Sequence, residues 1–146
     1  MPTASRDRTG TIMALDVGER RIGVAVANTY TRLPRALTTL QHTADIITQL
    51  QALLREHQAV CLVVGLPRGL NGQHTAQTAA VEQFAAQLTG QIHLPVQWQD
   101  EALTSQQAEA ELRARGKPYA KGDIDALSAV YILEDFLRDH SKESLQ

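Results

Sequence analysis

The sequence predicts an α/β protein whose mixed β-sheet is covered by helices on both faces. Two apolar runs near the N-terminus, Ile12–Leu15 and Ile22–Ala27, are separated by a short polar turn and predict an antiparallel pair of strands. A third short run, Ala36–Leu40, extends this pair to a three-stranded meander. The rest of the chain alternates between helical spacing and apolar runs, which is typical of parallel strands joined by helices.

The later elements follow from periodicity and from turn-forming residues. Apolar residues at helical spacing predict a helix that Thr43 caps and that runs to His57. The continuous apolar run Ala59–Val64 predicts a strand buried on both faces. The remaining predicted elements are a helix over 74–88, a strand over 96–100 with Trp98 in the core, a helix from 104 or 105 to 116 and a helix over 122–138. We expect a five-stranded sheet, with the first strand central beside the two later parallel strands.

The composition suits one soluble domain. Of 146 residues, 43% are hydrophobic and 21% are charged. We expect this domain to span 11–139, with flexible ends at 1–10 and 140–146. No apolar run approaches the roughly 20 residues that cross a membrane, and the N-terminus lacks the apolar segment of a secretory signal. The single cysteine, Cys61, lies in an apolar run and suits a reducing compartment, so we expect a cytoplasmic protein without a membrane partner.

The charge balance limits how nucleic acid could be bound. A net charge of −2 is not the bulk signature of a nucleic-acid-binding protein. Local basic segments would therefore have to hold any nucleic acid, and the sequence has two of them, at 19–21 and 113–121. Both segments fit solvated surface charge equally well.

Acidic residues stand at the ends of three predicted elements. Asp16 follows the first strand, Asp100 and Glu101 end the fifth, and Asp125 begins the last helix. With the first strand central, these ends can meet at one edge of the sheet, where three carboxylates suit Mg²⁺ or Mn²⁺. Two such ions about 4 Å apart activate water for phosphodiester hydrolysis. Alternation places Asp100 and Glu101 on opposite faces without showing which one faces the site.

The acids also have simpler explanations. Each one by itself fits a turn, a helix cap or a solvated strand end. Asp123, two residues before Asp125, cannot share its helix face and fits the dipole of the first turn instead. The spacing alone therefore leaves the metal site as one of two explanations.

Four short motifs occur in a fixed order between Thr11 and Leu137. They are Leu15-Asp-Val-Gly with Arg21-Ile-Gly-Val-Ala-Val26, Val64-Gly-Leu-Pro67 with Gly72, Asp100-Glu-Ala-Leu-Thr104, and Lys121-Gly-Asp-Ile-Asp-Ala126. Together they resemble the YqgF/RuvX family, bacterial nucleases assigned to pre-16S ribosomal RNA and related to Holliday junction resolvases. The resemblance implies an RNase H-like fold and a cytoplasmic role in maturing the 5′ end of 16S ribosomal RNA. It also implies junction resolution, which is described for some relatives.

The same resemblance implies the chemistry of the site. It implies that Asp16, Glu101 and Asp125 are the catalytic residues and hold Mg²⁺ or Mn²⁺. It thereby favours Glu101 over Asp100 at the end of the fifth strand. A water bound to the metal would attack the phosphorus.

Basic and polar side chains near the motifs are candidates for nucleic-acid binding. Arg21 and Lys121 are the predicted phosphate contacts, with Arg68 and Asn71 as weaker candidates. The loop that carries Arg68 and Asn71 fits a rigid turn equally well, and it is not a Walker A motif. The chain departs from the family at Ala102, where the family usually has Arg. A basic group beside the scissile phosphate is then missing, which bears on rate or substrate preference.

Two other functions fit parts of the sequence. An ATPase of the actin and sugar-kinase type also begins with an Asp-x-Gly strand turn, but it needs a second, similar domain for which 146 residues leave no room. A non-catalytic module of the same fold, binding nucleic acid or the transcription machinery, stays open because of the acidic balance and Ala102. The choice between pre-16S rRNA and branched DNA also stays open, as does that between monomer and homodimer, since a symmetric resolvase requires a two-fold dimer.

Overall fold

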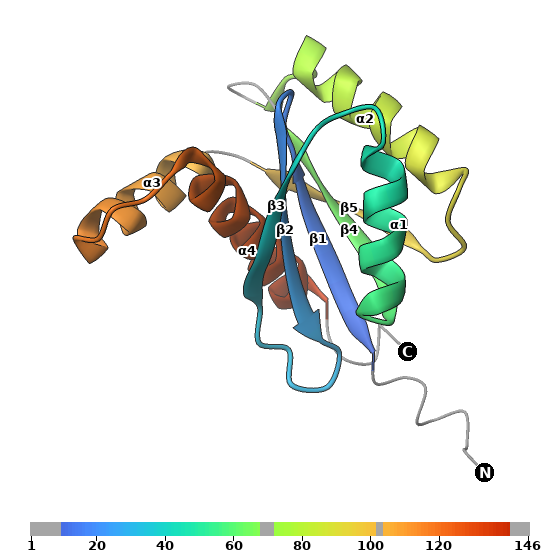
Figure 1. The fold of residues 1–146 in the computed structure, drawn as a ribbon, viewed down its shortest axis with the longest axis horizontal. Helices are drawn as coiled ribbons and strands as arrows, with labels where there is room; N and C mark the ends of the chain where they lie inside the picture. Colours follow the sequence, from blue (N-terminus) through green and yellow to red (C-terminus); the bar gives the residue numbers. More distant parts are fainter. Residues whose placement is uncertain (1–9, 68–71, 102–103, 141–146) are drawn as a thin grey trace.

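The computed structural model describes residues 10–67, 72–101 and 104–140, so most of the predicted flexible ends lies outside it. Within these ranges there are five strands and four helices (Figure 1). They are β1 (Thr11–Val17), β2 (Arg21–Asn28), β3 (Arg35–Gln41), α1 (Ile46–Glu56), β4 (Ala59–Pro67), α2 (Ala76–Thr89), β5 (Val96–Glu101), α3 (Thr104–Arg115) and α4 (Lys121–Asp139). The predicted order of elements is confirmed. No helix in the described ranges is long and apolar enough to cross a membrane.

The sheet is mixed and has β1 at its centre, in the strand order β3-β2-β1-β4-β5. β1 pairs antiparallel with β2, which sets Asp16 opposite Gly23, and parallel with β4, which sets Leu15 opposite Val64. β2 pairs antiparallel with β3, and β4 pairs parallel with β5. The predicted meander, the two parallel strands and the central place of the first strand are therefore confirmed.

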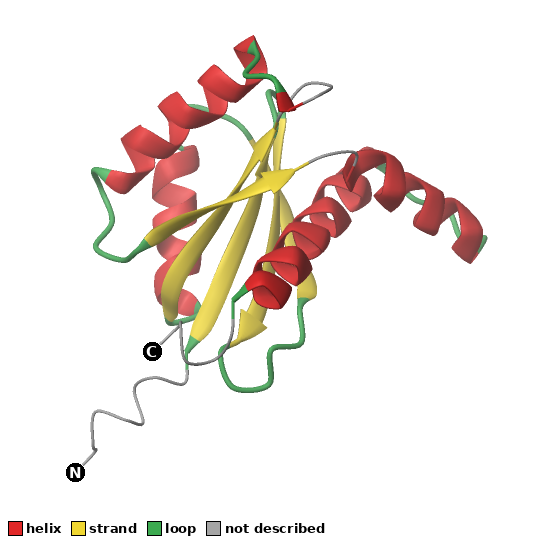
Figure 2. Cartoon of the chain, turned by 180° about the vertical axis from the view of Figure 1, so that it is seen from behind, coloured by secondary structure: helices red, strands yellow, loops and turns green. Residues whose placement is uncertain are grey.

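The two faces of the sheet carry separate hydrophobic cores. Side chains alternate between the faces along a strand, so Met13 and Leu15 join a core with α1 and α2. Ile12 and Ala14 join the other core, which α4 closes with Ile132, Leu133 and Phe136. Figure 2 shows α4 in front of the sheet and α1 behind it, which confirms helices on both faces. By the same alternation, Asp16 lies on the face that α4 covers.

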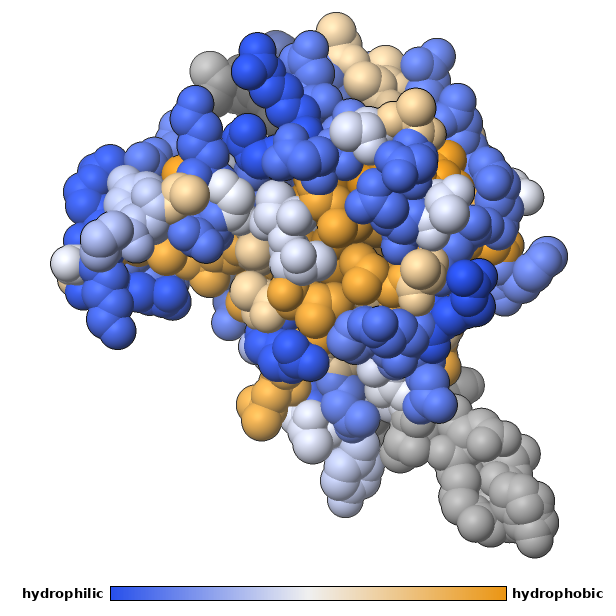
Figure 3. Space-filling model, viewed as in Figure 1, coloured by the Kyte–Doolittle hydropathy of each residue, from blue (hydrophilic) through white to orange (hydrophobic). Residues whose placement is uncertain are grey.

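The core under α1 and α2 is not completely covered. Figure 3 shows hydrophobic atoms at the middle of this face, surrounded by hydrophilic ones. Leu37, Leu40 and Ile47 are partly buried side chains that pack against this core. The site described below lies on the opposite face of the sheet, which α4 covers.

α4 lies directly on the backbone of β2 at Gly23. A Cβ atom on Gly23 would stand 1.9 Å from the carbonyl oxygen of Asp125, far inside the contact distance of any side chain. Glycine within a strand often marks such a close approach of another backbone. Thr39, which opposes Gly23 on β3, donates its hydroxyl to the carbonyl of Gly122 at 2.6 Å. Together these contacts fix where Asp125 stands above the sheet.

The structure corrects three local predictions. The N-cap of α1 is Asp45 rather than Thr43, because the Thr43 hydroxyl donates to the Asp45 carboxylate at 2.5 Å and the helix starts later. α4 begins at Lys121, so Asp125 lies one turn inside the helix rather than at its start. Trp98 is 42% exposed instead of lying in the core, because β5 is an edge strand and α2 packs over β4.

We expect Gly23→Ala to lower the free energy of unfolding by about 3 kcal/mol or more, because the added methyl group meets backbone that cannot move aside. Gly122→Ala is the matched control, since its Cβ meets only the Thr39 side chain at 3.6 Å or beyond. Alanine at this helical position should raise stability by up to about 1 kcal/mol. Urea unfolding of both variants measures the difference, and equal stabilities would contradict the close approach.

Candidate active site

Asp16 stands near the end of β1, in a crowded acidic environment. Burial is the largest cause that raises the pKa of Asp16 well above its usual value, and the carboxylates of Glu101 and Asp125 raise this pKa further. A hydrogen bond between the Asp16 and Glu101 side chains also raises the pKa of Asp16. Burial away from water and like charges nearby both favour the neutral form of a carboxyl group. The structure thus brings together the three carboxylates that the sequence placed at element ends.

Glu101, and not Asp100, lies on the side of β5 that faces this site. Gln99, two residues earlier, donates from its amide to Asp139 of α4 at 3.2 Å, so the odd-numbered positions of β5 face α4. Gly65 on the neighbouring strand leaves room for the Glu101 side chain, because a Cβ atom there would stand 2.9 Å from Glu101 Oε2. The geometry therefore assigns the position at the site to Glu101.

Asp125 joins the group from α4 and already has a cationic partner. Arg21, the first residue of β2, donates from Nε to Oδ2 of Asp125 at 2.5 Å. The exposed fractions of the two side chains are 28% for Arg21 and 20% for Asp125. Arg21 and Gly23 are two residues apart on one face of β2. The helix backbone that rests on Gly23 therefore brings Asp125 within reach of Arg21.

The donor set suits a divalent cation, although its present arrangement is not that of a metal site. Among the described residues, no three His, Cys, Asp or Glu side chains are placed so that they could hold a metal ion together. Carboxylate oxygens are nevertheless the ligands that Mg²⁺ and Mn²⁺ prefer. The repulsion that raises the pKa of Asp16 is relieved by a cation, and the space at Gly65 accommodates the Glu101 carboxylate. Asp16, Glu101 and Asp125 are therefore the residues that could hold such an ion.

The predicted nucleic-acid contacts lie only partly within the described residues. Lys121 is exposed in the first turn of α4, on the same helix face as Asp125 four residues later. Arg21 points at Asp125. The remaining candidates, Arg68 and Asn71, lie outside the described residues, and so does Ala102.

Sequence reasoning missed the residues that shape the site without carrying its charge. Gly23 and Gly65 both interrupt apolar strands, which is the usual sign of a close approach, but the sequence does not say what approaches. The contact between Arg21 and Asp125 joins positions 104 residues apart. Asp123 behaves as predicted for a first-turn acid, because its carboxylate accepts from the Ala120 backbone N–H at 2.9 Å.

Known proteins match nearly the whole chain. Residues 10–139 match the RuvX family, described as Holliday junction resolvase. The chain belongs to the RuvX family. A relative from Chloroflexus aggregans, named "Putative pre-16S rRNA nuclease", is 42% identical over 131 residues, covering 87% of this chain and 92% of that protein. A relative of the same name from Photorhabdus laumondii is 42% identical over 130 residues, covering 86% and 94%. The family indicated by the four motifs is confirmed.

Solved structures of resolvases share the fold of this RuvX-family chain. The fowlpox virus Holliday junction resolvase matches with a TM-score of 0.56 at 10% identity, covering 89% of this chain and 99% of that one. Thermus thermophilus RuvC in complex with a Holliday junction substrate matches with a TM-score of 0.51 at 17% identity, covering 89% and 96%. At these identities the likeness concerns the fold, and the predicted RNase H-like architecture is confirmed.

We expect Asp16→Asn to make the metal-free protein more stable than wild type at neutral pH. The pKa of Asp16 in the folded protein is raised above its ordinary value of 3.8. The stability that the protonated carboxyl contributes is therefore fully present below pH 3.8 and is lost as pH rises through the folded-state pKa. Asparagine does not ionise, so the stability gain of the variant should be smallest near about pH 4 and grow toward about pH 8. Thermal unfolding in a chelating buffer measures this gain, and a gain independent of pH would contradict the raised pKa.

Proposed function

We propose that this RuvX-family protein is a metal-dependent nuclease that hydrolyses phosphodiester bonds in the 5′-end maturation of pre-16S ribosomal RNA. The observation that carries the proposal is the meeting of Asp16, Glu101 and Asp125 from β1, β5 and α4 on one face of the sheet. The names of the relatives in Chloroflexus aggregans and Photorhabdus laumondii agree with this activity. A ribosomal RNA substrate also agrees with the expected cytoplasmic location.

Each carboxylate has a separate task in this proposal. A bound Mg²⁺ or Mn²⁺ supplies an activated water and stabilises negative charge on the leaving oxygen. Asp16 lies within the electrostatic influence of both other acids and would be the central ligand, while Glu101 and Asp125 would complete the donor set. Asp16 must lose its proton in order to bind a cation, so affinity for the cation falls as the solution becomes more acidic.

Arg21 and Lys121 are the proposed contacts to phosphate. Arg21 is partly buried next to Asp125. Lys121 is exposed on α4, one turn before Asp125 and on the same face of that helix. Two cations at the rim of an acidic site can hold a phosphodiester that the carboxylates alone would repel. Arg68 and Asn71, which follow β4 in the sequence, remain proposed contacts.

Two further functions compete with this one. Resolution of Holliday junctions is favoured by the description of the family. The alternative is a module of the same fold that binds nucleic acid or the transcription machinery without cutting; it rests on the acidic charge balance of the chain together with Ala102, which stands where the family usually has Arg. Monomer and homodimer also remain predictions, because a symmetric cut requires a two-fold assembly.

We expect Asp16→Asn to lower the rate of cleavage by at least about 100-fold, because it removes a charged ligand from the centre of the donor set. The substrates are an end-labelled 16S precursor RNA and a labelled four-way DNA junction, each with Mg²⁺ or Mn²⁺. Asp100→Asn is the matched control, since it removes the neighbouring carboxylate on the opposite face of β5. This control should keep the wild-type rate within about twofold.

The substrate that wild type cleaves assigns the function. The proposal is supported if wild type and Asp100→Asn cleave the RNA and Asp16→Asn does not. If this difference between the variants occurs only with the DNA junction, the function is junction resolution instead. If wild type binds either nucleic acid but cuts neither, the proposal fails in favour of the binding module.

A further inference from the structure

We propose that Arg21 is the resident counter-ion of the metal-free site and competes with the divalent cation for Asp125. This inference rests on the proposed metal-dependent function. This role of Arg21 is distinct from a phosphate contact, because Arg21 already pairs with Asp125 before substrate binds.

The ion pair is short and is fixed by the fold rather than by flexible ends. Arg21 Nε lies 2.5 Å from Asp125 Oδ2, so the two side chains form both an ion pair and a hydrogen bond. Arg21 comes from a strand beside the central one, and Asp125 lies over Gly23 on that same strand. The hydrogen bond from Thr39 to Gly122 holds the first turn of α4 in place. The pair is therefore a property of how α4 sits on β2.

Arg21 and a metal ion place opposing demands on the same carboxylate. The guanidinium occupies Oδ2 of Asp125, and no three acidic, cysteine or histidine side chains in the described ranges are arranged around a metal position. Asp125 is nevertheless close enough to Asp16 for its charge to act there. A divalent ion that takes Oδ2 of Asp125 as a ligand must displace Arg21, and an ion that approaches through the other carboxylate oxygen is still opposed by the fixed positive charge of Arg21.

This competition connects metal binding to substrate binding. Linkage is reciprocal: if binding of the cation weakens the ion pair, the ion pair lowers the affinity for the cation by the same factor. Once displaced, the guanidinium presents its N–H donors to an anion, and phosphate is the anion whose geometry it matches. Arg21 would thus hold Asp125 in the metal-free protein and would be released toward the substrate phosphate when the cation binds.

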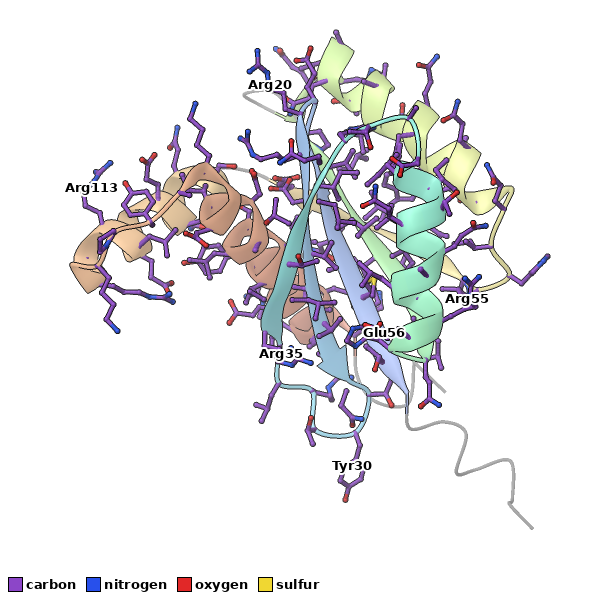
Figure 4. All side chains as sticks on the ribbon, viewed as in Figure 1. Arg20, Tyr30, Arg35, Arg55, Glu56 and Arg113 are labelled. Atoms are coloured by element: carbon purple, nitrogen blue, oxygen red, sulfur yellow. The ribbon has the colours of Figure 1, made fainter. Side chains whose placement is uncertain are left out.

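The experiment measures Mn²⁺ affinity without nucleic acid, from the free Mn²⁺ signal in electron paramagnetic resonance. Arg21→Gln should bind Mn²⁺ about fivefold more tightly than wild type, since the competing cation is gone. Arg20→Gln is the matched control: Arg20 is exposed and projects from the turn between β1 and β2, as Figure 4 shows. Its affinity for Mn²⁺ should match that of wild type.

A second readout tests the role of Arg21 as counter-ion independently of activity. In a chelating buffer Arg21→Gln should unfold at a lower temperature than wild type, because Asp125 then lacks its partner. Saturating Mn²⁺ should remove that difference, since the ion replaces the arginine. If Arg21→Gln is folded and binds Mn²⁺ no more tightly than wild type, the inference is wrong while the proposed nuclease function stands. If no variant binds Mn²⁺ at all, the inference and the proposed function fail together.

Discussion

The arrangement of the site depends on one backbone contact. Where the carbonyl of Asp125 meets Gly23, any Cβ atom would push α4 away from β2. This contact sets the height of Asp125 above the sheet and its reach to Arg21, and it places Asp125 near Asp16, the residue that opposes Gly23 on β1. Farther along α4, fully buried side chains such as Phe136 keep the helix on the sheet, each contributing about 1.5–3 kcal/mol through burial of apolar surface.

Three carboxylates can share this place without a cation because their charge is partly balanced. Burying an unpaired charge is costly, and proteins avoid that cost by pairing the group or by keeping it neutral. Both solutions occur here: Arg21 pairs with Asp125, and the raised pKa of Asp16 favours its neutral form. In the proposed function, a divalent ion would replace both the proton on Asp16 and the arginine on Asp125.

Much of the fold could be predicted from the sequence because apolar periodicity determines which elements form, and short connections determine how the meander pairs. The side of β5 that faces the site could not be predicted, because alternation separates Asp100 from Glu101 but only the pairing of the strand orients them. The pairing of Arg21 with Asp125 was also beyond reach, since 104 positions separate them and only the packing of α4 joins them. Trp98 was misplaced because hydrophobicity predicts burial without showing that β5 is an edge strand.

The most direct test of the metal site is anomalous diffraction from crystals grown with Mn²⁺. We expect an anomalous peak coordinated by Asp16, Glu101 and Asp125, with the guanidinium of Arg21 no longer on Asp125. A peak at other residues, or no peak from protein that cleaves nucleic acid in the same buffer, would contradict it.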